Sequence, residues 1–248
     1  MVNTTNRNFN SLKIGGIAPE AMFIPNGVKA NCYLFALAPK IGKGGYANRM
    51  NKSRPGDKCP HNKLRSMSFT NCQDINSRVT CDNKTTVKKI SSNFKHVKTE
   101  KIKDKFGNHL MIAVLSPGYN GTSQDFHFLR RINVYDVHPR IMKNIVMNSP
   151  SKTKNQLYNF MKNGGKNVWF HQRGWSDGGP LMYDAKNNLI TNPKKSNFNY
   201  GRLNYSKTCG LFNVRSRHAT VDSTYNKPSV VARRRKWTSM AHCLHNIW

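Results

Sequence analysis

Two residues of this 248-residue chain have the types and the placement that covalent catalysis on a carbonyl requires. Cys32 opens a short apolar run over 32–38, which predicts the first turns of a buried helix that Pro39 ends. A thiol at a helix N-terminus faces unpaired backbone N–H groups and the positive end of the helix dipole, and both favour the thiolate. His127 lies in the alternating segment 125–131, and an imidazole can take the thiol proton near neutral pH. The pair therefore predicts Cys32 as a nucleophile and His127 as its base.

A third polar group usually orients such an imidazole through its second ring nitrogen. His171 is the preferred candidate, because its predicted strand could lie beside the strand of His127. Asp184, one of only 11 acidic residues, is the alternative. A purely structural interpretation is also open, in which Cys32 is a small buried residue and the backbone satisfies His127.

The charge of the chain indicates a polyanionic partner. Lys and Arg number 41 against 11 Asp and Glu, which gives a formal net charge of +30. So large an excess repels itself unless polyanions are nearby, so nucleic acid, another polyanion or an assembly that contains one is the expected partner. The basic residues are spread along the whole chain, which favours contact with phosphates over reading of bases. A basic but solitary enzyme is the alternative.

Candidate nucleic-acid contacts are the places where basic residues adjoin apolar or aromatic ones. There, cations could neutralise phosphates and a tryptophan could stack on a base. These candidates are Arg130, Arg131, Arg233, Arg234, Arg235, Lys236 and Trp237. The competing interpretation is a solvated basic surface with Trp237 packed on the core.

The cysteines and the chain start predict a location inside the cell. No apolar stretch approaches 18 residues and residues 1–10 are polar, so we expect neither a membrane span nor a signal peptide. The six cysteines are then expected as free thiols or ligands in a reducing compartment, although an oxidising one would allow Cys72 to pair with Cys81. The spacing of Cys59, His61 and the other cysteines and histidines matches no regular zinc pattern, so no metal or other cofactor is expected.

Several segments predict the elements that must position these residues. The continuous apolar run 109–115 predicts a central strand, and 125–131 pairs naturally with it as a hairpin. Residues 151–162 have helical spacing, and 167–172 and 208–214 read as further core strands. The polar region 58–108 offers only short strands or helices. The chain therefore predicts an α+β fold, with a helix that carries Cys32 packed on an antiparallel sheet.

Six motifs, in order, resemble those of a group of proteins from bacteria, phages and large DNA viruses. That group carries N-C-Y-x-Y-A-L, P-G, D-x-H-x-x-R, W-x-H-K-x-G, D-x-x-x-x-I-x-x-P and C-G-x-F-x-V motifs. The corresponding segments here are Asn31 to Leu37, Pro55-Gly56, Asp125 to Arg130, Trp169 to Gly174, Asp184 to Pro193 and Cys209 to Val214. Gln172 stands where the group usually has lysine.

The group is in turn similar to papain-like peptidases of the NlpC type. The resemblance implies a papain-like fold, with Cys32 as nucleophile, His127 as base and His171 as orienter. It also implies a domain over 28–215 in which 132–165 is an insertion. An N-terminal arm over 1–27 and a basic C-terminal extension over 216–248 would flank that domain.

The sequence thus predicts a cysteine hydrolase that cleaves an amide bond and that is compatible with a place in a virus particle among other virion proteins. The alternative is a non-catalytic basic protein, structural or nucleic-acid-binding, on the same fold.

Overall fold

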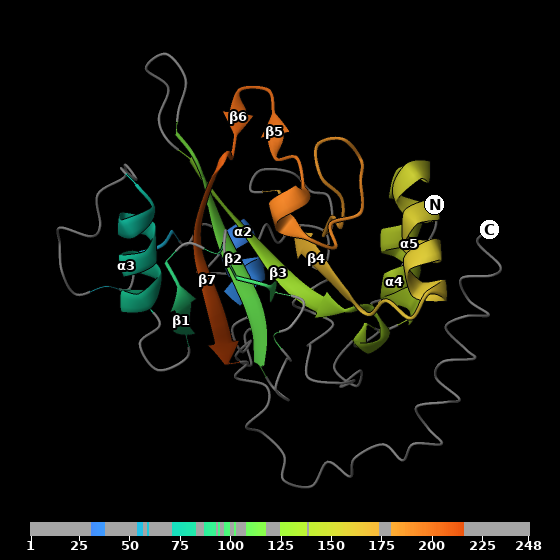
Figure 1. Ribbon diagram of the computed structural model, residues 1–248, viewed down its shortest axis with the longest axis horizontal. Coiled ribbons are helices and arrows are strands. Elements are labelled where there is room, and N and C mark those ends of the chain that lie inside the picture. The colour runs from blue at the N-terminus through green and yellow to red at the C-terminus, as the bar shows by residue number, and fades with distance from the viewer. Residues whose placement is uncertain are drawn as a thin grey trace, which may run out of the picture.

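The computed structural model describes about half of the chain around one antiparallel sheet (Figure 1). The described residues are 31–37, 54–56, 59, 71–82, 87–92, 94, 97–99, 102, 108–117, 125–137, 139–173 and 180–215. The tails, and with them the predicted arm over 1–27 and the extension over 216–248, lie outside these residues.

The sheet has five strands in the order β1-β7-β2-β3-β4, and every neighbouring pair is antiparallel. The strands are β1 (Val87–Ser91), β2 (Asn108–Ser116), β3 (Asp125–Asn133), β4 (Asn167–His171) and β7 (Lys207–Arg215). A two-stranded hairpin, β5 (Asn199–Tyr200) with β6 (Leu203–Asn204), precedes β7. The predicted strands at 109–115, 125–131, 167–172 and 208–214 are confirmed, and so is the α+β class.

Both faces of the sheet are buried, which explains why β2 is apolar at every position from Leu110 to Leu115. On one face Met111, Ala113 and Leu115 pack in a cluster with helix α2 (Cys32–Leu37), and on the other face Ile112 and Val114 pack with residues from β4, β7 and the loops. A strand that is covered on both sides gains from apolar residues at even and odd positions alike.

Four helices accompany the sheet among the described residues. They are α2 (Cys32–Leu37), α3 (Cys72–Asp82), α4 (Pro139–Met147) and α5 (Ser151–Lys162), and the 3-10 turns are η5 (Val134–Asp136) and η6 (Pro193–Lys195). The predicted helices at the Cys32 segment and at 151–162 are confirmed, whereas α3 and α4 were not predicted. No helix in the described ranges is long and apolar enough to cross a membrane.

Helix α3 lies against the last strand, and Gly210 is what allows this approach. A Cβ atom at Gly210 would collide with the Asn76 amide oxygen from α3 and with the ring of Phe212. The disulfide Cys72–Cys209 joins the same two elements. The glycine in the predicted Cys209-Gly210 strand motif is therefore a packing requirement.

The cysteines contradict the expectation of free thiols. Cys59 pairs with Cys81, and Cys72 pairs with Cys209, so Cys72 and Cys81 each have a partner other than the one considered from the sequence. Disulfides persist in oxidising surroundings, so the cysteines no longer argue for a reducing compartment. Cys32 is the one cysteine of the described residues that is not in a disulfide.

Candidate active site

Cys32 occupies the position that the sequence predicted, the first residue of a helix that packs on β3. The first intrahelical bond runs from the Phe35 N–H to the Asn31 carbonyl, and the backbone N–H groups of Cys32 and Tyr33, which precede it, act on the Cys32 thiol. The thiol is buried, with 4% of the residue exposed, and it donates to the Phe126 carbonyl over 3.9 Å.

This contact places the thiol at an open edge of β3. Strand β4 ends at His171, which lies opposite Leu129, so β3 has no β4 partner before that point. The N–H groups of Trp169 and His171 point away from β3, to the Ile190 and Leu181 carbonyls. The backbone N–H and C=O groups that join β3 to β4 therefore belong to even-numbered residues of both strands. Phe126 is also even-numbered, so its carbonyl points to the β4 side of β3, where β4 has already ended. Cys32 fills the place where the next residue of β4 would bond.

The environment of Cys32 raises the pKa of its thiol to about 12. Burial is the main cause, and the carboxylate of Asp125 adds to it. Backbone N–H groups of Phe128, Tyr33 and Cys32 itself act in the other direction. The expectation of a thiolate favoured by the helix start is therefore wrong for the resting protein, because loss of hydration outweighs the N–H groups and the dipole of a six-residue helix.

Two buried histidines form a hydrogen-bonded pair beside this edge. Nε2 of His127 lies 2.9 Å from Nδ1 of His171, with their ring centroids 4.9 Å apart. Nε2 of His171 lies 3.0 Å from the Tyr183 carbonyl. The side chain that was expected to meet His127 is thus the one that does.

The Tyr183 carbonyl fixes where the protons of this pair lie. A carbonyl only accepts, so Nε2 of His171 must carry its proton and donate it. A neutral His171 then offers Nδ1 as an acceptor, and His127 must donate from Nε2. Nδ1 of His127 is consequently the nitrogen that keeps its lone pair, which is the requirement for a base.

Both imidazoles are neutral at physiological pH. Burial lowers the pKa of His171 to about 4, although the Tyr183 carbonyl and Asp184 oppose the shift. Burial, with His171 as a further cause, lowers the pKa of His127 well below its usual value. An imidazolium–thiolate ion pair is therefore disfavoured in the resting site, and Cys32 and His127 are both uncharged.

Cys32 and His127 share no hydrogen bond within the described part of the chain. His127 pairs across the sheet with Val114, so its side chain leaves β3 on the face opposite Phe128, which packs with Cys32. The thiol lies at the strand edge between the two faces. Tyr205 interacts with both residues. Its ring centroid lies 5.1 Å from that of His127, and Cys32 is among the groups that raise the pKa of the Tyr205 hydroxyl.

Asp184, the alternative orienter, stabilises the turn in which it lies. Its oxygens accept from the backbone N–H groups of Lys186, Asn188 and Asn197, and the carboxylate is buried. None of its described hydrogen bonds reaches either imidazole. It influences His171 only through its charge.

Two tyrosines of the hairpin region were missed by sequence reasoning. Tyr205 donates to Oδ2 of Asp125 over 2.7 Å while its ring lies against His127. Tyr200 has its ring centroid 6.3 Å from that of His171, and its buried hydroxyl has no hydrogen-bond partner among the residues that the structure describes. The two rings cover the histidine pair and help to keep it dry. The only sequence signal was Asp125, two residues before His127.

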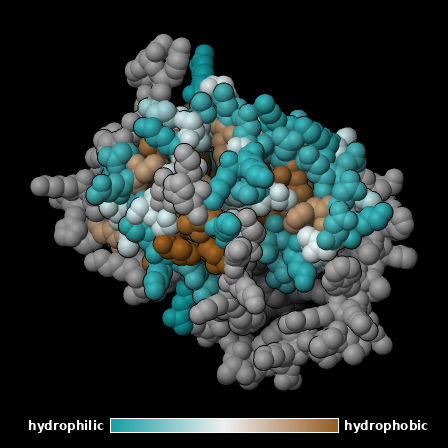
Figure 2. All heavy atoms as spheres, in the orientation of Figure 1, coloured by the Kyte–Doolittle hydropathy of each residue, from teal (hydrophilic) through white to brown (hydrophobic). Residues whose placement is uncertain are grey.

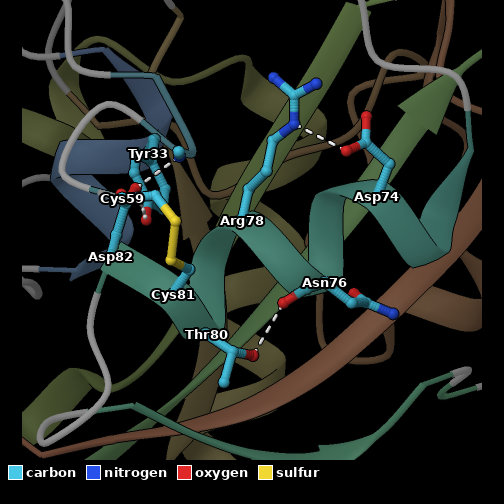
Figure 3. Close-up of a disulfide and its surroundings, with 9 residues drawn as sticks. Tyr33, Cys59, Asp74, Asn76, Arg78, Thr80, Cys81 and Asp82 are labelled. Atoms are coloured by element: carbon cyan, nitrogen blue, oxygen red, sulfur yellow. Dashed lines mark hydrogen bonds and ion pairs between the residues drawn. A yellow bond between two sulfur atoms is a disulfide. The ribbon is translucent and has the colours of Figure 1, made fainter. Parts of the chain in front are cut away.

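The Pro55-Gly56 motif and helix α2 are both bonded to α3 (Figure 3). Oδ2 of Asp82 accepts from the Tyr33 hydroxyl at 3.1 Å and from the Gly56 N–H at 2.6 Å. The adjacent residue, Cys81, forms the disulfide with Cys59. Helix α2, and with it Cys32, is thereby bonded to α3, which the Cys59–Cys81 disulfide constrains.

Two of the predicted nucleic-acid contacts are wrong. Arg130 and Arg131 are 1% and 3% exposed, so neither guanidinium can reach a phosphate. Arg131 instead donates to the Thr99 and Ile102 carbonyls and holds a loop on the sheet. The other candidates, residues 233–237, lie outside the described part of the chain.

No group of three or more metal-binding side chains occurs among the described residues. Cys59, Cys72 and Cys81, which were weighed as soft ligands, are joined in disulfides. Comparison of the chain with family models, curated proteins and solved structures finds no match.

Proposed function

We propose that the chain is a papain-like cysteine hydrolase of amide bonds, in which Cys32 is the nucleophile, His127 the base and His171 its orienter. The supporting observation is the proton arrangement from Tyr183 through His171 to His127. It leaves Nδ1 of His127 basic, and the ring of Tyr205 lies 5.1 Å from that of His127 while Cys32, the one described cysteine not in a disulfide, acts on the Tyr205 hydroxyl. The order of the six sequence motifs supports the same assignment.

The reaction begins from two neutral groups. The thiol turns from the Phe126 carbonyl, Sγ bonds to the substrate carbonyl carbon, and the thiol proton passes to Nδ1 of His127. Backbone N–H groups at the start of α2 hold the resulting oxyanion. The C–N bond then breaks, the amine leaves with the proton from His127, and a water molecule hydrolyses the thioester by the same route.

Alkylation of Cys32 by iodoacetamide tests this proposal. The variant Cys243→Ser serves as the parent, because Cys32 is then the one cysteine left outside the two disulfides. The modified peptide is identified by mass. We expect a rate that is nearly constant from pH 6.5 to 8, because neutral His127 accepts the proton throughout this range. In His127→Ala the rate should fall at least tenfold and rise about tenfold per pH unit, because only the rare thiolate then reacts.

His109→Gln is the matched control for loss of a buried histidine. Nε2 of His109 lies 2.7 Å from the Ala36 carbonyl in α2, and a glutamine amide can donate to the same carbonyl. This variant should alkylate as fast as the parent. Equal rates in the parent and in folded His127→Ala would refute the role of His127.

The orienting role of His171 makes a separate prediction. In His171→Leu, His127 loses the acceptor that fixes its tautomer, and we expect alkylation to slow about tenfold. In His171→Asn the amide oxygen can accept from His127, so the rate should stay within a few-fold of the parent. Nitrogen chemical shifts of the His127 ring report the tautomer directly. A protonated Nδ1 in the parent would overturn the assignment.

We also propose, as a second candidate, a non-catalytic protein that binds nucleic acid, in an assembly such as a virus particle. Two observations favour it: the net charge of +30, and a thiol that is buried with its pKa raised to about 12. Alkylation that is insensitive to His127, together with salt-sensitive binding of duplex DNA, would support this candidate over the hydrolase.

A further inference from the structure

We infer that four lysines, Lys152, Lys186, Lys194 and Lys195, form the surface that binds the phosphate backbone of a duplex nucleic acid. We call this surface the lysine face. The inference rests on the nucleic-acid-binding candidate and names its contact surface. It is independent of catalysis at Cys32.

Hydrogen bonds join the three segments that carry the lysine face. Nζ of Lys152, at the start of α5, lies 3.4 Å from the Lys186 carbonyl, and the Thr153 hydroxyl donates to the Asn187 carbonyl at 2.8 Å. The turn at 184–188 is in turn bonded to the segment after η6, since the Ala185 N–H donates to the Asn197 carbonyl. The lysines therefore project from one connected surface.

The lysine face lacks an exposed negative charge. Its segments contain a single carboxylate, Asp184, which is 2% exposed and fully engaged with backbone and amide N–H groups. Lys152, Lys186 and Lys195 are exposed, and Lys194 is half-buried. Their charges are thus available to a partner. Figure 2 shows mostly hydrophilic residues on the side of the molecule where α5 lies.

The neighbouring side chains favour nucleic acid over an anionic membrane. A membrane-binding surface combines cations with apolar side chains that enter the lipid. The exposed residues beside these lysines are Ser151, Asn155, Asn187 and Thr191. Hydroxyl and amide groups are common partners of phosphate oxygens. With Arg130 and Arg131 buried, this surface takes the role that the sequence had assigned to those arginines.

The experiment compares two variants of the full chain that each lose four positive charges. The test variant changes the four lysines of the lysine face to glutamine. The control changes four exposed cations on β1 and β7, namely Lys88, Lys89, Lys207 and Arg215. Binding to a 20-base-pair DNA duplex is measured by anisotropy from 50 to 300 mM salt, and binding to vesicles with anionic lipid is measured alongside.

Each released phosphate contact lowers the slope of log K against log salt by about 0.9. We therefore expect the test variant to bind at least tenfold more weakly at 100 mM salt, with a slope smaller by about 3 to 4. The control should keep most of its affinity and slope.

Equal losses in the two variants would overturn the lysine face and leave the nucleic-acid-binding candidate standing. No binding of duplex by the unchanged chain would overturn both. A loss on vesicles with none on duplex would assign the lysine face to a membrane and refute the inference.

Discussion

Removal of the Cys72–Cys209 disulfide should lower the free energy of unfolding by about 2 to 5 kcal/mol. This bond joins residues that are 137 positions apart, whereas Cys59–Cys81 spans 22. A cross-link restricts the unfolded chain more when it closes a longer loop, and the loop-entropy relation gives about 5 and about 3 kcal/mol for the two. The long-range bond also fixes α3 to the centre of the sheet.

The measurement is urea unfolding of two double variants, Cys72→Ala/Cys209→Ala and Cys59→Ala/Cys81→Ala. Alanine at both positions leaves no thiol that could form a new disulfide. The first variant should have the lower midpoint. A midpoint equal to that of the unchanged chain would show that this disulfide contributes nothing to stability.

Acidification should destabilise the fold steeply between pH 6.5 and 4. His109, His127 and His171 are buried, and burial lowers the pKa of each below the value of 6.5 expected in the unfolded chain. The unfolded chain therefore binds more protons in this range, so stability is full above pH 6.5 and is lost as the pH falls towards the folded pKa, about 4 for His171. Each histidine contributes up to about 1.4 kcal/mol of stability per pH unit, so the three together contribute up to about 4 kcal/mol per pH unit.

Unfolding free energies measured at pH 7, 6 and 5 check this prediction. His109→Gln removes one titrating group and keeps a donor for the Ala36 carbonyl, so the dependence on pH should fall by about a third. A free energy of unfolding that does not change from pH 7 to 5 would show that these imidazoles are hydrated in solution.

The strands and the histidine pair could be predicted because their signals are local. The apolar run of β2, the alternation around His127 and the run that contains His171 each identify a strand without knowledge of its neighbours. Once three strands and their order along the chain are expected, the pairing of β4 with β3 is a natural expectation. The contact between His127 and His171 follows from it.

Other features depend on contacts between distant segments, which no local pattern reports. Helix α3 has few apolar residues of its own, and a disulfide with β7 secures it. From the sequence, Arg131 is expected to be a surface cation. It is buried because both faces of the sheet are covered, and its partners, the Thr99 and Ile102 carbonyls, come from a distant segment. The raised pKa of the Cys32 thiol likewise follows from burial at the β3 edge, which depends on where β4 ends.

The position of β7 in the sheet has a consequence for biosynthesis. This strand is the last of the described strands along the chain, yet it lies between β1 and β2. A nascent polypeptide that has emerged only as far as β6 would have β1 and β2 without the partner that joins them. The sheet can close only after residues 207–215 leave the ribosome. Cys72 can likewise be oxidised with Cys209 only after β7 has been synthesised.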